Sequence, residues 1–310
     1  MILYSSLNEI KENRPGLSVC ALGNFDGIHK GHQKLIETAV SKARKKGIRS
    51  SVFTFSEHPI NVMSGHTMVK TILKPEDKFA ILESMGVDYV FNLPFSDEIR
   101  TLSPEDFARD LLKRDLNIDF AVCGFNFTFG YKAGGKHDDL ISYGKEFGFG
   151  AEVIDPVEVD GVIVSSTLIR ACIEKGEMPL YKSYTGRPYM IYGTVIQGEH
   201  NGRKMGFPTI NLQLDTEMAL PANGVYTTRT LIEGECRKSV TNVGNKPTIG
   251  TFAKNAETHI FDFHENIYGK PVKIEFIRMQ RPEYRFENME ELAHQIEKDA
   301  QEAKKYHDLH

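Results

Sequence analysis

The chain has 310 residues, more than one hydrophobic core usually supports, so its length predicts two domains. Hydrophobic residues make up 40% and charged residues 26%, which excludes a mostly disordered or fibrous chain, and a net charge of −4 with neither half basic argues against nucleic acid as a partner. No stretch reaches the roughly 18 apolar residues of a membrane span and the first residues have no signal-peptide layout, so we expect a cytoplasmic protein with no membrane partner.

The first part of the chain alternates short apolar runs with amphipathic helical patterns. The strand patterns cover residues 17–23, 49–55, 88–93, 118–124 and 150–156, and the helical patterns cover residues 31–47, 74–86, 103–115, 137–148 and 165–176. In the helix at 31–47 one stripe carries Leu35, Ile36, Ala39, Val40 and Ala43. Strands and helices that alternate in this way predict a Rossmann-like, doubly wound parallel sheet.

The pattern changes after about residue 185. From 189 to 279 the segments alternate with period two and are broken by Gly, Asn and Pro, which predicts an antiparallel sheet or a small closed β-barrel. Residues 288–306 return to helical spacing, with an apolar stripe that packs on the barrel and consists of Met289, Leu292, Ile296 and Ala300. The fold class is therefore α/β plus all-β, with domains at 1–184 and 185–310.

Four cysteines are far apart in the sequence: Cys20, Cys123, Cys172 and Cys236. They form no C-x-x-C pair, and no histidine stands at the spacing of a zinc ligand. We expect all four to be buried, reduced thiols.

The most informative segment is GNFDGIHKGH, residues 23–32, between the first predicted strand and the first predicted helix. In an open α/β sheet this turn is a common phosphate site, because ligands bind beyond the carboxyl ends of the strands. Gly23, Gly27 and Gly31 let the backbone approach a ligand closely, and the helix opens with free N–H groups. His29 and His32, three residues apart, can both face one bound anion.

The two histidines suit a reaction in which charge builds up on phosphate oxygens. Phosphoryl and nucleotidyl transfers proceed mainly by positioning and electrostatic stabilisation, and no P-loop or dinucleotide fingerprint occurs in the chain. Two alternatives remain open: two polar residues that cap a helix without a ligand, and a zinc site, for which the sequence shows no third ligand.

A second segment, VSSTLIR at 164–170, places hydroxyl groups at another helix start. Ser165, Ser166 and Thr167 lie there, and Arg170 follows in the first turn, a layout that can hold part of a triphosphate. Taken alone, this segment is equally typical of an ordinary N-cap.

A third segment, GFNFTFG at 124–130, follows a strand. It offers the Asn126 amide between the rings of Phe125 and Phe127, which could orient and stack against an aromatic ligand. The alternative is that these rings belong to the core.

These segments, together with HP after the second strand, resemble in their order the adenylyltransferase half of the bacterial bifunctional riboflavin kinase/FMN adenylyltransferases, or FAD synthetases. The pattern G-x-F-D-G-x-H-x-G-H is matched at every fixed position. The resemblance implies that His29 and His32 are catalytic and that Asn126, Phe125 and Phe127 bind flavin. It also implies ATP-binding positions at Gly23, Phe25, Asp26, Gly27, Gly31, Ser165, Ser166, Thr167 and Arg170.

The second half has a motif of its own in GRKMGFPTINL, residues 202–212. Thr209 and Asn211 stand two residues apart and so share one strand face, and neutral oxygen ligands of this kind suit a hydrated Mg²⁺ with nucleotide phosphates. ETHIFDF, 257–263, begins with Glu257, a carboxylate that could take a proton from a substrate hydroxyl. From the pattern alone, an ordinary surface glutamate is the better interpretation of Glu257.

The order and spacing of GTVIQG, GFPTINL, GVYTTR, NVGNKPTIG, ETHIFDF and NIYGKPV resemble the riboflavin kinase module. That resemblance implies Mg²⁺ at Thr209 and Asn211, ATP at Gly206 and Pro208, and Glu257 as the base. Two departures are Ile210, where the family often has Ala, and the segment GYKAGGKHDD at 130–139, which lacks the usual Gly-Asp close.

The resemblance therefore implies a bifunctional enzyme that converts riboflavin to FMN and FMN to FAD with ATP. Its partners would be these small molecules, and we expect a monomer or weak homo-oligomer. Two rival interpretations are an enzyme that retains only one of the activities and a flavin- or nucleotide-binding regulator without turnover.

Overall fold

The computed structural model describes residues 1–197, 207–248 and 251–310, with side chains described outside 246–253. The chain divides into two compact units, Met1–Ser166 and Thr167–His310. The boundary between the two units is at 166/167, whereas the domain boundary predicted at 184/185 falls at the end of α9 (Met178–Thr185). The division into domains at 1–184 and 185–310 stays a prediction.

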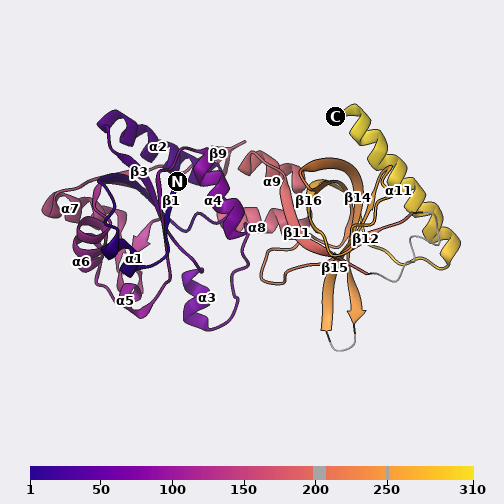
Figure 1. Cartoon of the computed structure of the whole chain (residues 1–310), viewed down its shortest axis with the longest axis horizontal. Helices are drawn as coiled ribbons and strands as arrows, with labels where there is room; N and C mark the ends of the chain where they lie inside the picture. The colour runs from indigo at the N-terminus through magenta and orange to yellow at the C-terminus, as the bar shows by residue number, and fades with distance from the viewer. Residues whose placement is uncertain (198–206, 249–250) are drawn as a thin grey trace. The chain divides into compact units, whose positions relative to one another are not determined.

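The first unit contains a six-stranded sheet in the order β1-β4-β3-β2-β5-β8, in which every neighbouring pair is parallel (Figure 1). The chain moves outward from β2 to β3 and β4 and then returns to the other side of β2, so the winding direction changes between β2 and β5. The doubly wound parallel sheet predicted from the sequence is confirmed. The strands are β1 (Ile2–Tyr4), β2 (Ser18–Leu22), β3 (Arg49–Phe55), β4 (Tyr89–Leu93), β5 (Ile118–Gly124) and β8 (Gly150–Ile154).

Helices cover both faces of this sheet. Helix α2 (Lys30–Lys46) packs on β2, β3 and β5, and the stripe predicted for it is the set of residues that it buries, with Gly47 as a left-handed C-cap. A second core, between the opposite face and the segment 107–140, contains Cys20, Leu22 and Phe53. The remaining helices are α1 (Leu7–Glu12), α3 (Pro59–Ser64), α4 (Pro75–Ser84), α5 (Asp97–Arg100), α6 (Pro104–Asp106), the 3₁₀-helix η2 (Tyr131–Ala133) and α7 (His137–Phe147).

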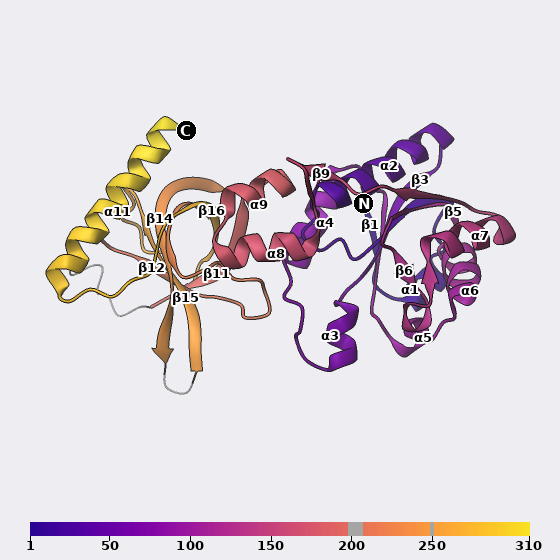
Figure 2. The ribbon, with the colours of Figure 1, turned by 180° about the vertical axis from the view of Figure 1, so that it is seen from behind.

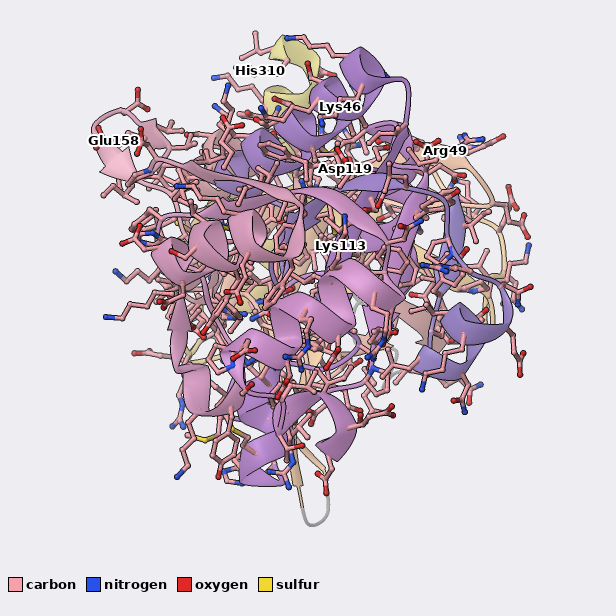
Figure 3. The ribbon with its side chains drawn as sticks, turned by 90° about the vertical axis from the view of Figure 1, so that its left-hand side faces the viewer. Lys46, Arg49, Lys113, Asp119, Glu158 and His310 are labelled. Carbon is pink, nitrogen blue, oxygen red and sulfur yellow. The ribbon has the colours of Figure 1, made fainter. Side chains whose placement is uncertain are left out.

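The C-terminal end of α2 is joined to the sheet by an ion pair. Lys46, the last residue of the helix, donates to the Asp119 carboxylate on β5 over 2.6 Å, on the side of the unit that Figure 3 shows. Because both side chains are partly exposed, the pair contributes at most about 1 kcal/mol. The ion pair helps to orient α2 on the sheet, and the N-terminal end of the same helix follows the histidine segment.

Three features of this unit differ from the sequence pattern. The first residues form β1 and α1, which are too short to show a period. The helix predicted at 103–115 begins with α6, capped by Ser103, and continues as a π-helix, η1 (Phe107–Asp115), whose wider turns have no counterpart in a 3.6-residue pattern. Two short hairpins were also not predicted: β6 (Thr128–Phe129) with β7 (Gly135–Lys136), and β9 (Glu158–Val159) with β10 (Val162–Ile163).

The second unit is built on a closed antiparallel barrel in the order β11-β12-β15-β14-β13-β16, as predicted. Helix α11 packs against β13 and β14 (Figure 2), and β14 and β15 continue beyond the barrel as a two-stranded ribbon. Helices α8 (Ser166–Lys175) and α9 precede the barrel in the chain. The remaining elements are β11 (Tyr189–Ile196), β12 (Ile210–Gln213), β13 (Gly224–Ile232), β14 (Glu235–Thr248), β15 (Thr251–Ile260), β16 (Pro271–Pro282) and α11 (Met289–Leu309).

The predicted stripe of α11 is confirmed only in part: Ala300 is buried, and Leu292 and Ile296 are half-buried. Met289 is 60% exposed, and the buried residues are Asp299, Ala300, Ala303 and His307. Asp299 is buried because Arg281 of β16 pairs with both of its carboxylate oxygens, at 3.0 and 2.7 Å. The apolar stripe did not reveal Asp299 as part of the packed face, because hydrophobicity does not show a buried ion pair.

The cysteine prediction was wrong for one residue. Cys236 is exposed at the start of β14, beside the turn that joins it to β13. Cys20, Cys123 and Cys172 are buried, and burial raises the pKa of the Cys20 and Cys123 thiols to about 12. Those two thiols therefore remain protonated at neutral pH, as expected for inert core cysteines.

His307 on α11 gives this unit an expected dependence on acid. Its Nε2 lies 2.9 Å from the Thr228 carbonyl oxygen, and burial lowers the pKa of the imidazole. Below about pH 6.5 the unfolded chain takes up a proton that the folded protein resists, so the free energy of unfolding should fall as the pH falls.

Urea unfolding at pH 7.5 and pH 5.5 measures this effect. His307→Gln should lose stability at pH 7.5 but should show a smaller further loss at pH 5.5 than the wild-type protein. The dependence should not vanish, because burial also lowers the pKa of His259. Equal pH dependence in the two proteins would contradict a role for His307.

Candidate active sites

The histidine segment lies where the winding of the sheet reverses. Residues 23–29 leave the carboxyl end of β2 and lead into α2, and the next strand on the other side is β5. Crevices at this position are where open α/β sheets bind their ligands. The fold therefore places this segment at the expected binding edge.

The loop holds an unusual backbone conformation. Phe25, Gly27 and Ile28 have positive φ angles of 48°, 82° and 33°, and both apolar side chains are fully buried. A methyl group on Gly27 would lie 3.0 Å from Ile72 Cδ1, so the loop is packed as closely as its backbone permits. Positive φ in a buried Phe and Ile persists only where the surroundings enforce it, and such positions concentrate at functional sites.

The two predicted catalytic histidines lie against each other. The rings of His29 and His32 stack with centroids 3.8 Å apart and an angle of 21° between their planes. His29 is the N-cap of α2, and its Nδ1 accepts a long hydrogen bond of 3.4 Å from the His32 backbone N–H. With Nδ1 as acceptor, Nε2 of a neutral His29 ring carries the proton and can donate to an anion.

Gly31 leaves just enough room for this arrangement. A methyl group there would lie 3.1 Å from Nδ1 and Cε1 of His29. We expect Gly31→Ala to displace the ring by a few tenths of an ångström and to slow the reaction at this site on the order of tenfold.

The measurement is product formation at this site alongside thermal unfolding. The helix itself should not suffer, because Ala is the better helix former by up to about 1 kcal/mol. Glu37→Ala, at an exposed position of the same helix, is the matched control. Wild-type rates in Gly31→Ala would show that the position of the His29 ring is not critical.

The predicted VSSTLIR segment meets the same loop. The Ser166 hydroxyl donates to the Asp26 carbonyl oxygen over 2.9 Å, and the Val164 carbonyl lies 3.7 Å from where a methyl group on Gly31 would be. Ser165 and Ser166 are thus near the histidine segment. Thr167 and Arg170 follow on α8 in the second unit, where Thr167 is exposed and Arg170 half-buried.

The GFNFTFG segment emerges from β5, next to β2. Phe125 is 42% exposed and Asn126 is exposed, so both are accessible at the binding edge of the sheet. Phe127 is half-buried, stacks on Phe129 at 5.7 Å and packs on the core. The sequence left open whether these rings contact a ligand or belong to the core. Phe127 has the contacts of a core residue, whereas Phe125 and Asn126 do not.

Two polar residues that contact the loop could not be identified from the sequence pattern. Lys78 of α4 and Thr54 of β3 bind each other over 3.0 Å, and both donate to the Asn24 carbonyl oxygen. The Asp26 carboxylate in turn accepts the Ile72 N–H over 2.9 Å. These contacts anchor the loop to the rest of the unit.

The second predicted site is formed by two neighbouring strands of the barrel. The register of β12 and β15 places Asn211 directly opposite Glu257, so their side chains share a face, with Thr209 two residues before Asn211. The buried Asn211 amide oxygen accepts a hydrogen bond of 3.1 Å from Asn255 Nδ2. The strand pairing thus brings Glu257 to the same face as Thr209 and Asn211, from which almost fifty positions separate it in the sequence.

A cavity of 530 Å³ opens beside this face. Pro208, Thr209 and Asn211 line it, and Glu257 is not among the lining residues. His264, Glu265 and Tyr268 also line it; sequence reasoning missed them, although they follow directly after the strand that carries Glu257. Gly206, predicted to bind ATP, lies outside the described residues.

The donor set at Thr209 and Asn211 is compatible with Mg²⁺. In the described part of the chain no group of three His, Cys, Asp or Glu side chains is placed to hold a metal ion. A hydroxyl and an amide oxygen at the wall of a cavity fit a cation that retains much of its water and takes its other ligands from nucleotide phosphates. The bond from Asn255 orients the Asn211 amide oxygen.

Comparison with known proteins decides what these two sites belong to. A family model described as FAD synthetase matches residues 11–168, and one described as riboflavin kinase matches residues 185–307. The bifunctional riboflavin kinase/FMN adenylyltransferase of Bacillus subtilis is 38% identical over 307 residues, covering 96% of this chain and 94% of that protein. The chain belongs to the bifunctional riboflavin kinase/FMN adenylyltransferase family.

Other members and a solved structure are similar over the same extent. The Escherichia coli K12 riboflavin kinase/FMN adenylyltransferase is 31% identical, covering 94% of this chain and 93% of that protein. A crystal structure described as a macrolide-efflux protein from Streptococcus pneumoniae has a TM-score of 0.88 and 32% identity over 96% of both chains. Among the described residues, no helix has the length and apolar character needed to cross a bilayer.

Membership gives the enzyme two activities. It phosphorylates riboflavin to FMN and adenylylates FMN to FAD, and it uses ATP for both steps. The predicted family, fold class and bifunctional enzyme are confirmed. The residues assigned to each step stay predictions.

Proposed function

We propose that FMN adenylylation takes place at the histidine segment and riboflavin phosphorylation at the Thr209–Asn211–Glu257 face of the barrel. The observation that carries the first assignment is the stacked pair His29 and His32 at the first turn of α2, at the carboxyl end of the central strand. For the second, it is the pairing of Asn211 with Glu257 beside the cavity.

In the adenylylation site the FMN phosphate attacks the α-phosphate of ATP and pyrophosphate leaves. The nucleophile is already an anion, so no general base is needed. His29 and His32 stabilise the charge on the pentavalent phosphorus, with the N–H groups at the start of α2 adding to the positive field. Ser165 holds the departing phosphates, and Asn126 orients a substrate; Ser166, Thr167 and Arg170 stay predictions for ATP binding.

In the kinase site Glu257 accepts the proton of the ribityl 5′-hydroxyl as its oxygen attacks the γ-phosphate of ATP in line. Thr209 and Asn211 would hold Mg²⁺ through their side-chain oxygens. When bound, Mg²⁺ neutralises charge on the phosphate oxygens. A cytoplasmic location and a monomer or weak homo-oligomer remain predictions from the sequence.

Incubation with riboflavin and Mg-ATP, followed by chromatography, tests the assignment of both activities. We expect FMN with ADP first, and then FAD with pyrophosphate. FMN alone, or FAD from added FMN alone, would mean that one site is inactive. Bound flavin without ADP or pyrophosphate would indicate a regulator.

A further inference from the structure

Lys78 joins the histidine segment to strand β3 of the sheet. From α4 its Nζ donates to the Asn24 carbonyl oxygen over 3.3 Å and to Thr54 Oγ1 over 3.0 Å. The Thr54 hydroxyl, fully buried at the end of β3, donates to the same carbonyl over 2.8 Å. One carbonyl of the loop thus accepts two hydrogen bonds, one of them from a cation.

The bonds fix the peptide plane before a strained residue. In a trans peptide the N–H points opposite to the carbonyl, so the Phe25 N–H is directed away from Lys78. Phe25 follows with a φ of 48°, which is costly for a side chain of its size. Its buried ring meets the His32 ring edge-on at 5.2 Å. A continuous chain of contacts therefore runs from the Lys78 ammonium to His32.

The ammonium group of Lys78 is largely removed from water and, among the described residues, has no carboxylate as a hydrogen-bond acceptor. Both of its hydrogen-bond acceptors are neutral oxygens. Loss of hydration lowers the pKa of Lys78 to about 8, and the charge of Asp26 acts in the opposite direction. Other titratable side chains on the surrounding loop, strand end and helices are His29, His32, Glu57, His58, Lys74, Glu76 and Asp77. A lysine on the exposed face of an amphipathic helix would be fully hydrated. At this position, by contrast, the Lys78 ammonium loses part of its favourable hydration.

We propose that Lys78 is a positioning residue of the adenylylation site, whose ammonium group holds the Asn24–Phe25 peptide and thereby the His32 ring in place. The inference rests on the role proposed for His29 and His32. A charge-assisted hydrogen bond is about twice as strong as a neutral one, so loss of the proton should loosen the loop.

The pH profile of FAD formation shows whether the charge matters. In the wild-type enzyme kcat/KM for ATP should fall as the pH rises through about 8, because this ratio reports the free enzyme and Lys78 loses its proton there. Carboxylates and imidazoles ordinarily titrate below pH 7, so they do not produce this limb.

Three variants test the inference with the full-length enzyme. Lys78→Met, of similar length but uncharged, should lower kcat/KM for FAD formation roughly tenfold and abolish the decline above pH 8. Lys78→Arg should keep most of the activity and move the decline to higher pH, since its guanidinium remains protonated. Lys45→Met, at an exposed position of α2, is the matched control and should behave as wild type.

Riboflavin phosphorylation by the same preparations and their thermal unfolding show whether each variant is folded. If Lys78→Met does not fold, Lys78→Arg still decides, because an unchanged decline near pH 8 in that variant would overturn the proposal. So would wild-type kcat/KM and an unchanged pH profile in a folded Lys78→Met. A result in which His29→Ala and His32→Ala also retain FAD formation overturns the assignment of the site itself, and the two failures are thus distinguishable.

Discussion

His29→Ala should reduce FAD formation about a hundred- to a thousandfold, which is the usual effect of removing one donor to a charged transition state. The ring is positioned for that role: it caps α2, stacks on His32 and, with Nδ1 as an acceptor, presents Nε2–H as a donor. Conversion of riboflavin to FMN should continue at the wild-type rate, because the kinase residues lie in the other compact unit.

Loss of the helix cap must be separated from loss of the imidazole. Replacing a capping side chain by Ala costs about 0.5–2 kcal/mol of stability. His29→Asn restores a good capping residue without the ring, so it should recover stability but not FAD formation. Rates of pyrophosphate release and thermal unfolding of both variants provide the measurement. Recovery of FAD formation by Asn would mean that capping, and not the imidazole, is what the reaction needs.

The elements that could be predicted from the sequence are those whose buried residues repeat at the regular spacing of a helix or a strand. Helix α2 is the clearest case, because its five buried positions repeat at helical spacing and Gly47 ends it. Helix α11 shows the limit of this rule, because its packed face also includes Asp299, which binds Arg281 and, at 2.8 Å, Gln295. A buried carboxylate looks like a solvated one in a sequence until its partner is located.

The same contrast applies to the sites. The histidine segment could be predicted because its functional residues are contiguous, whereas the positive φ angles of Phe25 and Ile28 could not. The role of Lys78 could not be predicted, because its hydrogen-bond partners Asn24 and Thr54 are 54 and 24 residues away in the sequence. Its pattern on α4 is that of a solvated lysine. Likewise, only strand register shows that Asn211 and Glu257 are opposite each other.

Glu257→Gln should reduce FMN formation from riboflavin about a hundred- to ten-thousandfold, the range associated with loss of a general base. The amide has the same size as the carboxylate and can keep hydrogen bonds on the Asn211 face, so folding should be preserved while proton acceptance is lost. FAD formation from added FMN should be unchanged, which makes this variant the mirror image of His29→Ala.

Glu257 does not line the cavity, so a second measurement is needed to separate a base from a residue that only shapes the site. If Glu257 takes the proton, the kcat of Glu257→Gln should fall while the KM values for riboflavin and ATP change little, because ground-state binding does not require the negative charge. Glu290→Gln, at an exposed position of α11, is the control. A rise in KM with an unchanged kcat would instead assign Glu257 to substrate binding and leave the proton to a solvent molecule or to another group beside Asn211.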